Sequence, residues 1–253
     1  MLNVLFFYAC LLLPFACFAQ SEDYHQAMAL GEHAAASRQF SQAIQHYGQA
    51  IKLAPRDIEP YLRQMEVAIQ KRDLSIFKRT IHQLEGLEHP LPLDVYITYV
   101  QLAKKQRLYN DGLAMLTKAE LKHKTSKTLL LHRAGLYQKL NDNAKVIQTL
   151  NTALEHYPQS TDVLHQLATI YININPQKSI ELHKKLLAEP HYKDVALSAL
   201  GLLHTKLYEA DPGANNRNNL VLALSYYNQY FQRHPQDQEA RNMIENIRIL
   251  LDQ

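Results

Sequence analysis

Residues 24–57 read YHQAMALGEHAAASRQFSQAIQHYGQAIKLAPRD, and the rest of the chain repeats the pattern of this stretch. It contains two short amphipathic segments, which are separated at residues 37–39, and it ends at a turn around Pro55. Small residues stand where two helices would cross closely, and large residues fill the places between them. The small residues are Gly31, Ala34, Ala43 and Ala50, and the large ones are Leu30, Phe40 and Tyr47. The stretch therefore predicts two helices that pack against each other across a tight turn.

This stretch resembles a tetratricopeptide repeat, which is a helix-turn-helix unit of about 34 residues. The resemblance is carried by Leu30, Gly31, Phe40, Ala43, Tyr47, Ala50 and Pro55. Because no such unit buries its apolar face alone, neighbouring units stack on one another. The resemblance implies an all-α fold, a right-handed α-solenoid of about six helix-turn-helix repeats plus a C-terminal capping helix.

The pattern recurs along the chain at intervals of about 34 residues. On the first helix of each unit, the position of Ala34 recurs at Ala68, Ala103, Tyr137, Tyr171 and His204. On the second helix, the position of Tyr47 recurs at Ile81, Leu116, Leu150, Lys184 and Tyr227. Lys184 is the polar exception in this inward-facing row, and its alkyl stem is expected to lie across the groove between the helices.

The recurrence predicts a repeat array over residues 24–236, with a short spacer before it at 20–23. The expected helical pairs are 24–57, 58–92, 93–126, 127–160, 161–193 and 194–236. The last pair is expected to contain an inserted loop at 210–219, because ADPGANNRNN is rich in turn-forming residues. Residues 237–253 are expected to form an amphipathic helix that caps the end of the array.

Residues 1–19 contain no charged side chain and are almost wholly apolar from residue 4 onward. Cys17 and Ala19 place small residues before Gln20, which predicts a secretory signal peptide at 1–19. The protein is therefore expected to be exported to the periplasm or the extracellular space. Two alternatives remain open: an uncleaved anchor, and lipid attachment at Cys17 or Cys10. Membrane association is expected only if the leader is retained or lipidated.

Both cysteines of the chain, Cys10 and Cys17, lie in this leader. The predicted mature chain therefore contains no cysteine and can form neither a disulfide nor a thiolate metal site. The 13 histidines include no pair spaced i, i+4, and the sequence has no nucleophile or phosphate-binding motif. We expect a protein that is not an enzyme and has neither a metal nor another cofactor. The alternative is a cryptic enzyme or metal protein whose site is assembled from different repeats.

The formal net charge is only +3, and the basic residues are spread along the chain, so nucleic acid is not an expected partner. The resemblance instead implies a protein or peptide segment. In the family, such a segment binds to the inner surface of the array. This surface is formed by the second, fifth, ninth, twelfth and thirteenth residues of the first helix in each pair, which we call groove positions. An expected apolar strip on this surface consists of Met28, Leu62, Ile69, Ile97, Leu131 and Ile172. The remaining predicted partner-binding residues are Glu32, Glu66, Gln101, Lys104, Lys105, Gln138 and His165.

Met28 and Glu32 stand where carboxylate-binding members of the family have a cationic clamp, so capture of a C-terminal carboxylate is not expected. An extended or helical segment with apolar anchors is the better match. The alternative is that the strip merely completes the internal packing. The function expected is an exported, non-catalytic interaction scaffold for envelope assembly or secretion, or else a lipid-anchored membrane assembly factor similar to pilus-biogenesis pilotins.

Overall fold

A computed structural model describes residues 22–253, and every regular element in this range is helical. The chain divides into two compact units, residues 1–124 and residues 125–253. The predicted leader, residues 1–19, lies outside the described residues. Residues 22–23, which the sequence assigned to the spacer, are helical.

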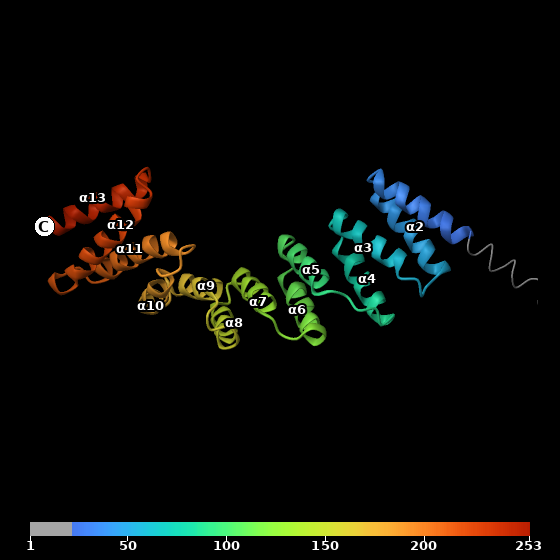
Figure 1. Ribbon diagram of the computed structural model, residues 1–253, viewed down its shortest axis with the longest axis horizontal. Coiled ribbons are helices and arrows are strands. Elements are labelled where there is room, and N and C mark those ends of the chain that lie inside the picture. The colour runs from blue at the N-terminus through green and yellow to red at the C-terminus, as the bar shows by residue number, and fades with distance from the viewer. Residues whose placement is uncertain (1–21) are drawn as a thin grey trace, which may run out of the picture. The chain divides into compact units, whose positions relative to one another are not determined.

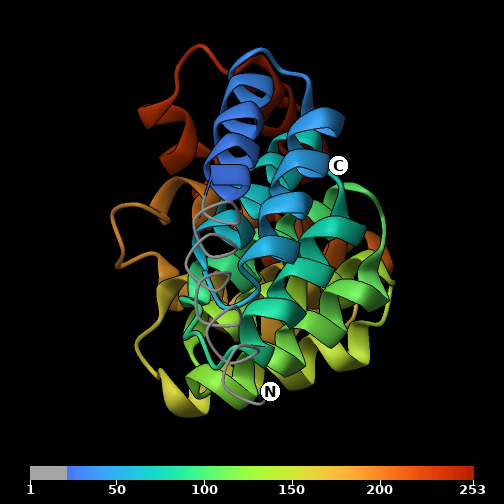
Figure 2. The same ribbon diagram turned by 90° about the vertical axis from the view of Figure 1, so that its right-hand side faces the viewer.

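The described part of the first unit consists of antiparallel helical pairs (Figure 1). The first helix, residues 22–36, lies beside α2, and Figure 2 shows the same pair from a second direction. The other pairs are α3 with α4 and α5 with α6. The bounds are Phe40–Leu53 for α2, Glu59–Lys71 for α3, Leu74–Gly86 for α4, Leu93–Lys105 for α5 and Tyr109–His123 for α6.

The second unit continues the same arrangement with α7 beside α8, α9 beside α10 and α11 beside α12. Its bounds are Lys127–Lys139 for α7, Asn143–His156 for α8, Thr161–Tyr171 for α9, Pro176–Leu186 for α10, Lys193–Ala210 for α11, Arg217–Arg233 for α12 and Gln238–Asp252 for α13. The last helix, α13, packs on α12 through Tyr227, Ile244 and Ile247. The expected all-α fold of helix-turn-helix repeats with a further helix at the C-terminal end is confirmed.

The segment 210–219 is helical at both ends, because α11 extends to Ala210 and α12 begins at Arg217. Between them lies a single 3-10 turn, η1 (Ala214–Asn216). The amide of Asn216 donates to the carboxylate of Asp211 at 2.9 Å and to its carbonyl at 3.0 Å. These bonds close the loop between the two helices.

The turn inside most pairs is closed by a residue with a left-handed backbone. Arg38, Arg72, Arg107 and Asn141 stand at the same place in their pairs, with φ of 57°, 59°, 62° and 57°. The following amide donates to the carbonyl five residues earlier, as in Gln39 N to Ala34 O at 2.8 Å and Asp73 N to Ala68 O at 2.8 Å. This is the Schellman arrangement that ends a helix. In these four pairs, the residue at the position of Ala34 is the one whose carbonyl accepts the bond that closes the turn.

The fifth pair departs from this geometry, and its inward-facing residues shift by one position. The amide of Asn175 donates to Tyr171 O at 2.9 Å, four residues earlier, so this turn is one residue shorter than the others. As a result Lys184, which the sequence placed in the inward-facing row, is exposed. His183 occupies that place and is 1 % exposed. The predicted alignment of Lys184 with Tyr47 is therefore wrong.

The buried polar groups of α10 are paired locally. Ser179 is fully buried, and its hydroxyl donates to Ala168 O at 2.8 Å. Nδ1 of His183 lies 2.9 Å from Ser179 O, within hydrogen-bond distance. Burial lowers the pKa of His183, and the hydrogen bond to Ser179 opposes this effect in part. The imidazole is therefore held neutral in the folded protein.

Candidate interaction surface

In the first unit, the predicted groove residues differ in exposure. Met28 and Ile97 are buried, at 9 % and 8 % exposure, which agrees with the alternative that they complete the packing. Leu62 and Ile69 are half-buried. The polar members lie at the surface: Glu32, Glu66, Gln101 and Lys105 are exposed, and Lys104 is half-buried. The apolar strip of this unit is thus partly used by the protein's own core.

In the second unit, Leu131, His165 and Ile172 are half-buried and Gln138 is exposed. Leu131 packs on the core between α7 and α9, and Ile172 packs against Ile180 and the leucines of α11. The ring of His165 lies 5.0 Å from the ring of Tyr192. Burial lowers the pKa of His165, while the charge of Asp162 acts in the opposite direction. The partner-binding role of these residues remains a prediction.

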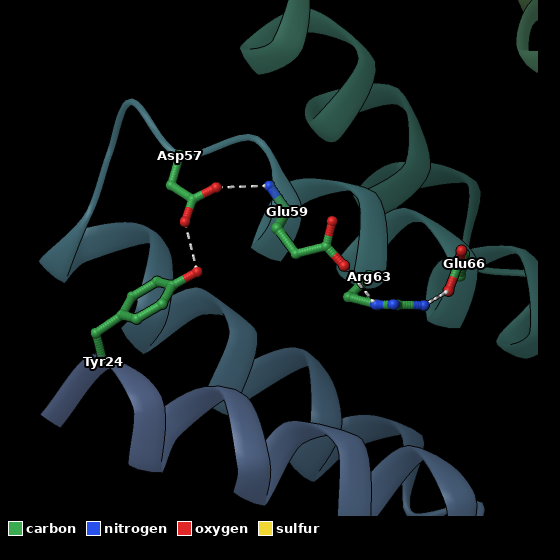
Figure 3. A network of polar contacts seen from close by, with 5 residues as sticks. All are labelled: Tyr24, Asp57, Glu59, Arg63 and Glu66. Carbon is green, nitrogen blue, oxygen red and sulfur yellow. Dashed lines mark hydrogen bonds and ion pairs between the residues drawn. The ribbon is translucent and has the colours of Figure 1, made fainter. Parts of the chain in front are cut away.

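Glu66 belongs to a network of polar contacts at the start of α3 (Figure 3). Nε of Arg63 lies 2.9 Å from Glu59 Oε1, and Nη1 lies 3.2 Å from Glu66 Oε2. Asp57 accepts the backbone N–H of Glu59 at 3.0 Å and the hydroxyl of Tyr24 at 2.6 Å. Because the ion pairs are exposed, they add little stability. Their effect is to balance the two glutamates with one guanidinium.

The charge of Arg63 also acts on Tyr47, a buried residue of the first pair. Burial raises the pKa of Tyr47, and the charge of Glu32 adds to this increase. The charge of Arg63 lowers the pKa of the same phenol and so opposes these two effects in part. A buried tyrosine, a glutamate and an arginine thus form one local arrangement.

The predicted partner-binding residues include none from the sixth pair, although the groove positions can be counted there in the same way. Counted from Asp194, the second, fifth and ninth residues are Val195, Ser198 and Leu202. Val195 is 47 % exposed and Leu202 is 37 % exposed. Among the large apolar residues that are exposed in the described chain, these two stand at groove positions. The open apolar surface is therefore on α11 and not on the helices that the sequence emphasised.

A pocket of about 290 Å³ adjoins this surface between α11, α12 and α13. We call it the C-terminal pocket. Its lining consists of Ser198, Leu202, Tyr227, Tyr230, Asp237, Glu239, Ala240 and Met243. Asp237 accepts the hydroxyl of Tyr230 at 3.0 Å and the backbone N–H of Ala240 at 2.9 Å, which fixes the start of α13. Two carboxylates and no basic side chain line the pocket.

Two larger cavities have no such relation to the groove positions. One, of about 450 Å³, lies between the first helix and α2, beside Ala27 and Leu30. The other, of about 320 Å³, lies around Tyr96, whose hydroxyl donates to Glu85 at 2.8 Å. Glu85 is in turn paired with Lys118 at 2.5 Å. The charges around Tyr96 are therefore balanced within the protein.

Within residues 22–253, no group of three or more His, Cys, Asp or Glu side chains is placed to hold a metal ion. No helix in this range is both long enough and apolar enough to cross a membrane.

No protein-family model and no curated protein matches the sequence. Solved structures do resemble the fold. A tetratricopeptide repeat protein from Parabacteroides merdae ATCC 43184 has a TM-score of 0.58 at 18 % identity, over 77 % of this chain and 73 % of that chain. YrrB, a TPR protein with an unusual peptide-binding site, has a TM-score of 0.55 at 15 % identity, over 78 % of this chain and 96 % of that chain.

PilW, a widely conserved type IV pilus biogenesis factor, has a TM-score of 0.51 at 15 % identity, over 87 % of this chain and 98 % of that chain. At such low identities the likeness concerns the fold alone. The paired helices, the Schellman turns and these similar structures agree: this chain has the fold of the tetratricopeptide repeat proteins.

Proposed function

We propose that this protein is an exported, non-catalytic scaffold that binds a segment of a partner protein at its groove positions, in envelope assembly or secretion. The observation that carries the proposal is the exposure of Val195 and Leu202 at groove positions beside the C-terminal pocket. YrrB, which is similar in fold, is described by its peptide-binding site. PilW, also similar in fold, is described as a pilus biogenesis factor.

The chemistry of α11 supports binding of an extended or helical segment with apolar anchors. Covering Val195 and Leu202 would remove apolar area from water, which contributes about 25 cal/mol per Å². The surface is built on helices whose opposite faces are buried, as at Leu200 and Leu203. A preformed surface of this kind limits the entropy lost on binding.

A comparison of variants tests the groove. Val195→Asp combined with Leu202→Asp places two charges where the partner's apolar anchors would lie, while both sites stay exposed in the folded protein. We expect crosslinked co-purification from the native host to lose its specific partner. The control is Leu121→Asp on α6, where the side chain is 82 % exposed and not at a groove position. Circular dichroism checks that both variants keep their helices. Equal partner recovery from both variants would contradict binding at α11.

Export is tested at the N-terminus of the mature protein. The uncharged segment 1–19 supports cleavage before Gln20, and the lipid-anchored alternative requires an acylated Cys17 or Cys10. Mass spectrometry of the protein recovered from its host distinguishes the outcomes. A chain that begins at Gln20 supports the exported form, and a diacylated or triacylated cysteine supports the lipid-anchored form. An intact Met1 contradicts both and supports the uncleaved anchor.

A further inference from the structure

The start of α13 repeats the start of α3 in sequence and in bonding. Asp57 and Asp237 each follow a proline by two residues, and each has a glutamate two residues after it. Asp57 accepts a backbone N–H at 3.0 Å and a tyrosine hydroxyl at 2.6 Å. Asp237 also accepts a backbone N–H and a tyrosine hydroxyl, from Ala240 at 2.9 Å and from Tyr230 at 3.0 Å, although these donors stand at other positions than Glu59 and Tyr24. Glu239 is therefore the counterpart of Glu59.

The helical pair that precedes each of these helices also has the same packing. In the first pair, the ring of Tyr47 lies on Gly31. In the sixth pair, the ring of Tyr227 lies on Gly201, where an added Cβ would be 2.8 Å from three ring atoms. Both rings are buried, at 2 % and 5 % exposure. Both pairs thus bury a tyrosine against a glycine, and in the sixth pair that tyrosine lines the same pocket as Glu239.

The two places differ in one charge. Four residues after Glu59 stands Arg63, which pairs with Glu59 at 2.9 Å. Four residues after Glu239 stands Met243. Within the described chain, the carboxylate of Glu239 has no ion pair and no hydrogen bond. Among residues 22–253, none supplies at α13 the cation that Arg63 supplies at α3.

The charges around Tyr227 differ from those around Tyr47 in the same way. Burial raises the pKa of Tyr227 to about 12, and the charges of Glu239 and Glu209 add to the increase. No cation opposes them, whereas Arg63 does so at Tyr47. Tyr227 lines the pocket, and its hydroxyl has no hydrogen-bond partner among the described residues. The pocket thus joins apolar walls to an unbalanced negative charge.

The basic side chains of neighbouring turns do not supply this charge. Arg233 is paired with Asp194. Arg241 lies over the ring of Phe231, with its guanidinium carbon 5.4 Å from the ring centroid. Lys206 donates to Asn173 at 2.9 Å. Glu239 is exposed, so water solvates its carboxylate in the free protein and the carboxylate stays available to a cationic group of a ligand.

We propose that the C-terminal pocket binds an arginine side chain of the partner segment, with its guanidinium at Glu239 in the role that Arg63 has at Glu59. This inference rests on the proposed function and names the chemistry of the partner. The aliphatic stem would pack on Leu202 and Met243, as arginine stems commonly do on apolar surfaces. The planar guanidinium can bond a carboxylate through two N–H groups and lie against a tyrosine ring. Lysine offers neither the fork nor the flat face.

Peptide titration tests the inference with the protein produced from the full chain. The probes are capped pentapeptides, Ala-Leu-Xaa-Leu-Ala, in which Xaa is arginine or citrulline. Citrulline has nearly the shape of arginine without its charge. Because charge-assisted bonds are roughly twice as strong as neutral ones, we expect the citrulline peptide to bind about tenfold more weakly in calorimetry.

Three variants locate the effect. Glu239→Gln keeps the size of the side chain and should weaken the arginine peptide about tenfold, to the level of citrulline. Glu245→Gln is the matched control, because Glu245 is exposed on the same helix and does not line the pocket. Met243→Arg restores the spacing of Glu59 and Arg63, so it should fill the site from within and abolish the preference for arginine. Unchanged helicity verifies that each variant is folded.

Equal binding of the arginine and citrulline peptides would overturn the inference, as would equal effects of Glu239→Gln and Glu245→Gln. N-acetylarginine amide, which lacks the flanking leucines, should bind more weakly than the peptide; equal affinity would indicate a small-molecule site instead. Self-association that Glu239→Gln abolishes would make a second copy the occupant and also overturn it. If the host partner still requires Val195 and Leu202, the proposed function stands even when the arginine preference fails.

Discussion

The ring of Tyr47 lies so close to the backbone of Gly31 that an added Cβ would be 2.6 Å from Cε1. Real Cβ atoms do not approach other atoms so closely, and here the obstacle is a buried aromatic ring. Ala43 and Ala50, which are fully buried on α2, complete the contact with the first helix. The absence of a side chain at Gly31 is thus what lets the large ring of Tyr47 fit inside the first pair.

We expect Gly31→Ala to destabilise the protein by about 1–3 kcal/mol, because it overpacks this contact. The gain in helix propensity, about 1 kcal/mol, works against the loss but does not cancel it. Urea unfolding followed by circular dichroism measures the difference. Gly48→Ala is the matched control on α2, since the nearest atom to its new Cβ is 3.7 Å away. It should stabilise the protein by about 0.5–1 kcal/mol, and equal effects of the two variants would contradict the packing argument.

Replacing the left-handed residue in the turn of the first pair by glycine is expected to stabilise the protein, in contrast to Gly31→Ala. Arg38 has φ 57°, a conformation that costs a residue with a Cβ about 1 kcal/mol relative to glycine. Arg38→Gly is therefore expected to raise the free energy of unfolding by about 0.5–1 kcal/mol. The same change at Arg79, exposed in the interior of α4, should lower it by about 1 kcal/mol. A loss of stability in Arg38→Gly would show that its side chain has a role that the backbone does not explain.

Gln64 occupies a position that is usually apolar, and both the nitrogen and the oxygen of its buried amide are hydrogen-bonded. Its nitrogen donates to Ile44 O at 3.1 Å, and its oxygen accepts the hydroxyl of Thr80 at 3.2 Å. Thr80 is fully buried, and Gln64 is 3 % exposed. Gln64→Leu should cost about 1–3 kcal/mol, because it leaves the Ile44 carbonyl and the Thr80 hydroxyl without that partner.

A double-mutant cycle separates this hydrogen bond from packing. Gln64→Leu combined with Thr80→Val should cost less than the sum of the single changes, by about 0.5–1 kcal/mol. Gln70→Leu, an exposed site on the same helix, controls for the change of residue type. Strict additivity in chemical unfolding would mean that the two side chains do not interact.

Buried histidines predict that stability falls in mild acid. Burial lowers the pKa of His183 and His204, so both are neutral in the folded protein at neutral pH. In the unfolded chain a histidine has a pKa near about 6.5, so below that pH the unfolded state takes up protons that the folded state does not. The free energy of unfolding should therefore be constant above about pH 7.5 and fall as the pH drops through about 6.5, by about 1.4 kcal/mol per pKa unit of depression.

Urea unfolding at pH 7.5 and pH 5.5 measures this fall. His183→Gln removes one titrating group and should flatten the pH dependence, while His33→Gln, at an exposed site, should not. Carboxylates such as Asp111, whose pKa is held low by Lys78 and by the hydroxyl of Tyr99, lose their contribution only at more acidic pH. An identical slope in the two histidine variants would contradict a buried neutral His183.

The sequence alone determined the repeating unit, because the features that define it are local. The spacing placed Gly31 where two helices cross closely and Tyr47 among the residues that fill the gaps, and the structure shows these two in contact. The recurring position of Ala34 is the one whose carbonyl closes the turn in four of the pairs. These relations lie within one helical pair, so a fixed interval in the sequence corresponds to a fixed contact. The all-α repeat fold could therefore be predicted without coordinates.

Only the tertiary structure decided what depends on neighbouring elements. The turn of the fifth pair is shorter by one residue, which places His183 inward and Lys184 outward. The residue types in that turn do not indicate its length. Met28 and Ile97 share the groove positions of Leu62, yet packing buries them. The C-terminal pocket exists because α11, α12 and α13 bring Leu202, Tyr227 and Glu239 together. Burial and charge balance are sums over all neighbours in space, so a periodic pattern along the chain cannot contain them.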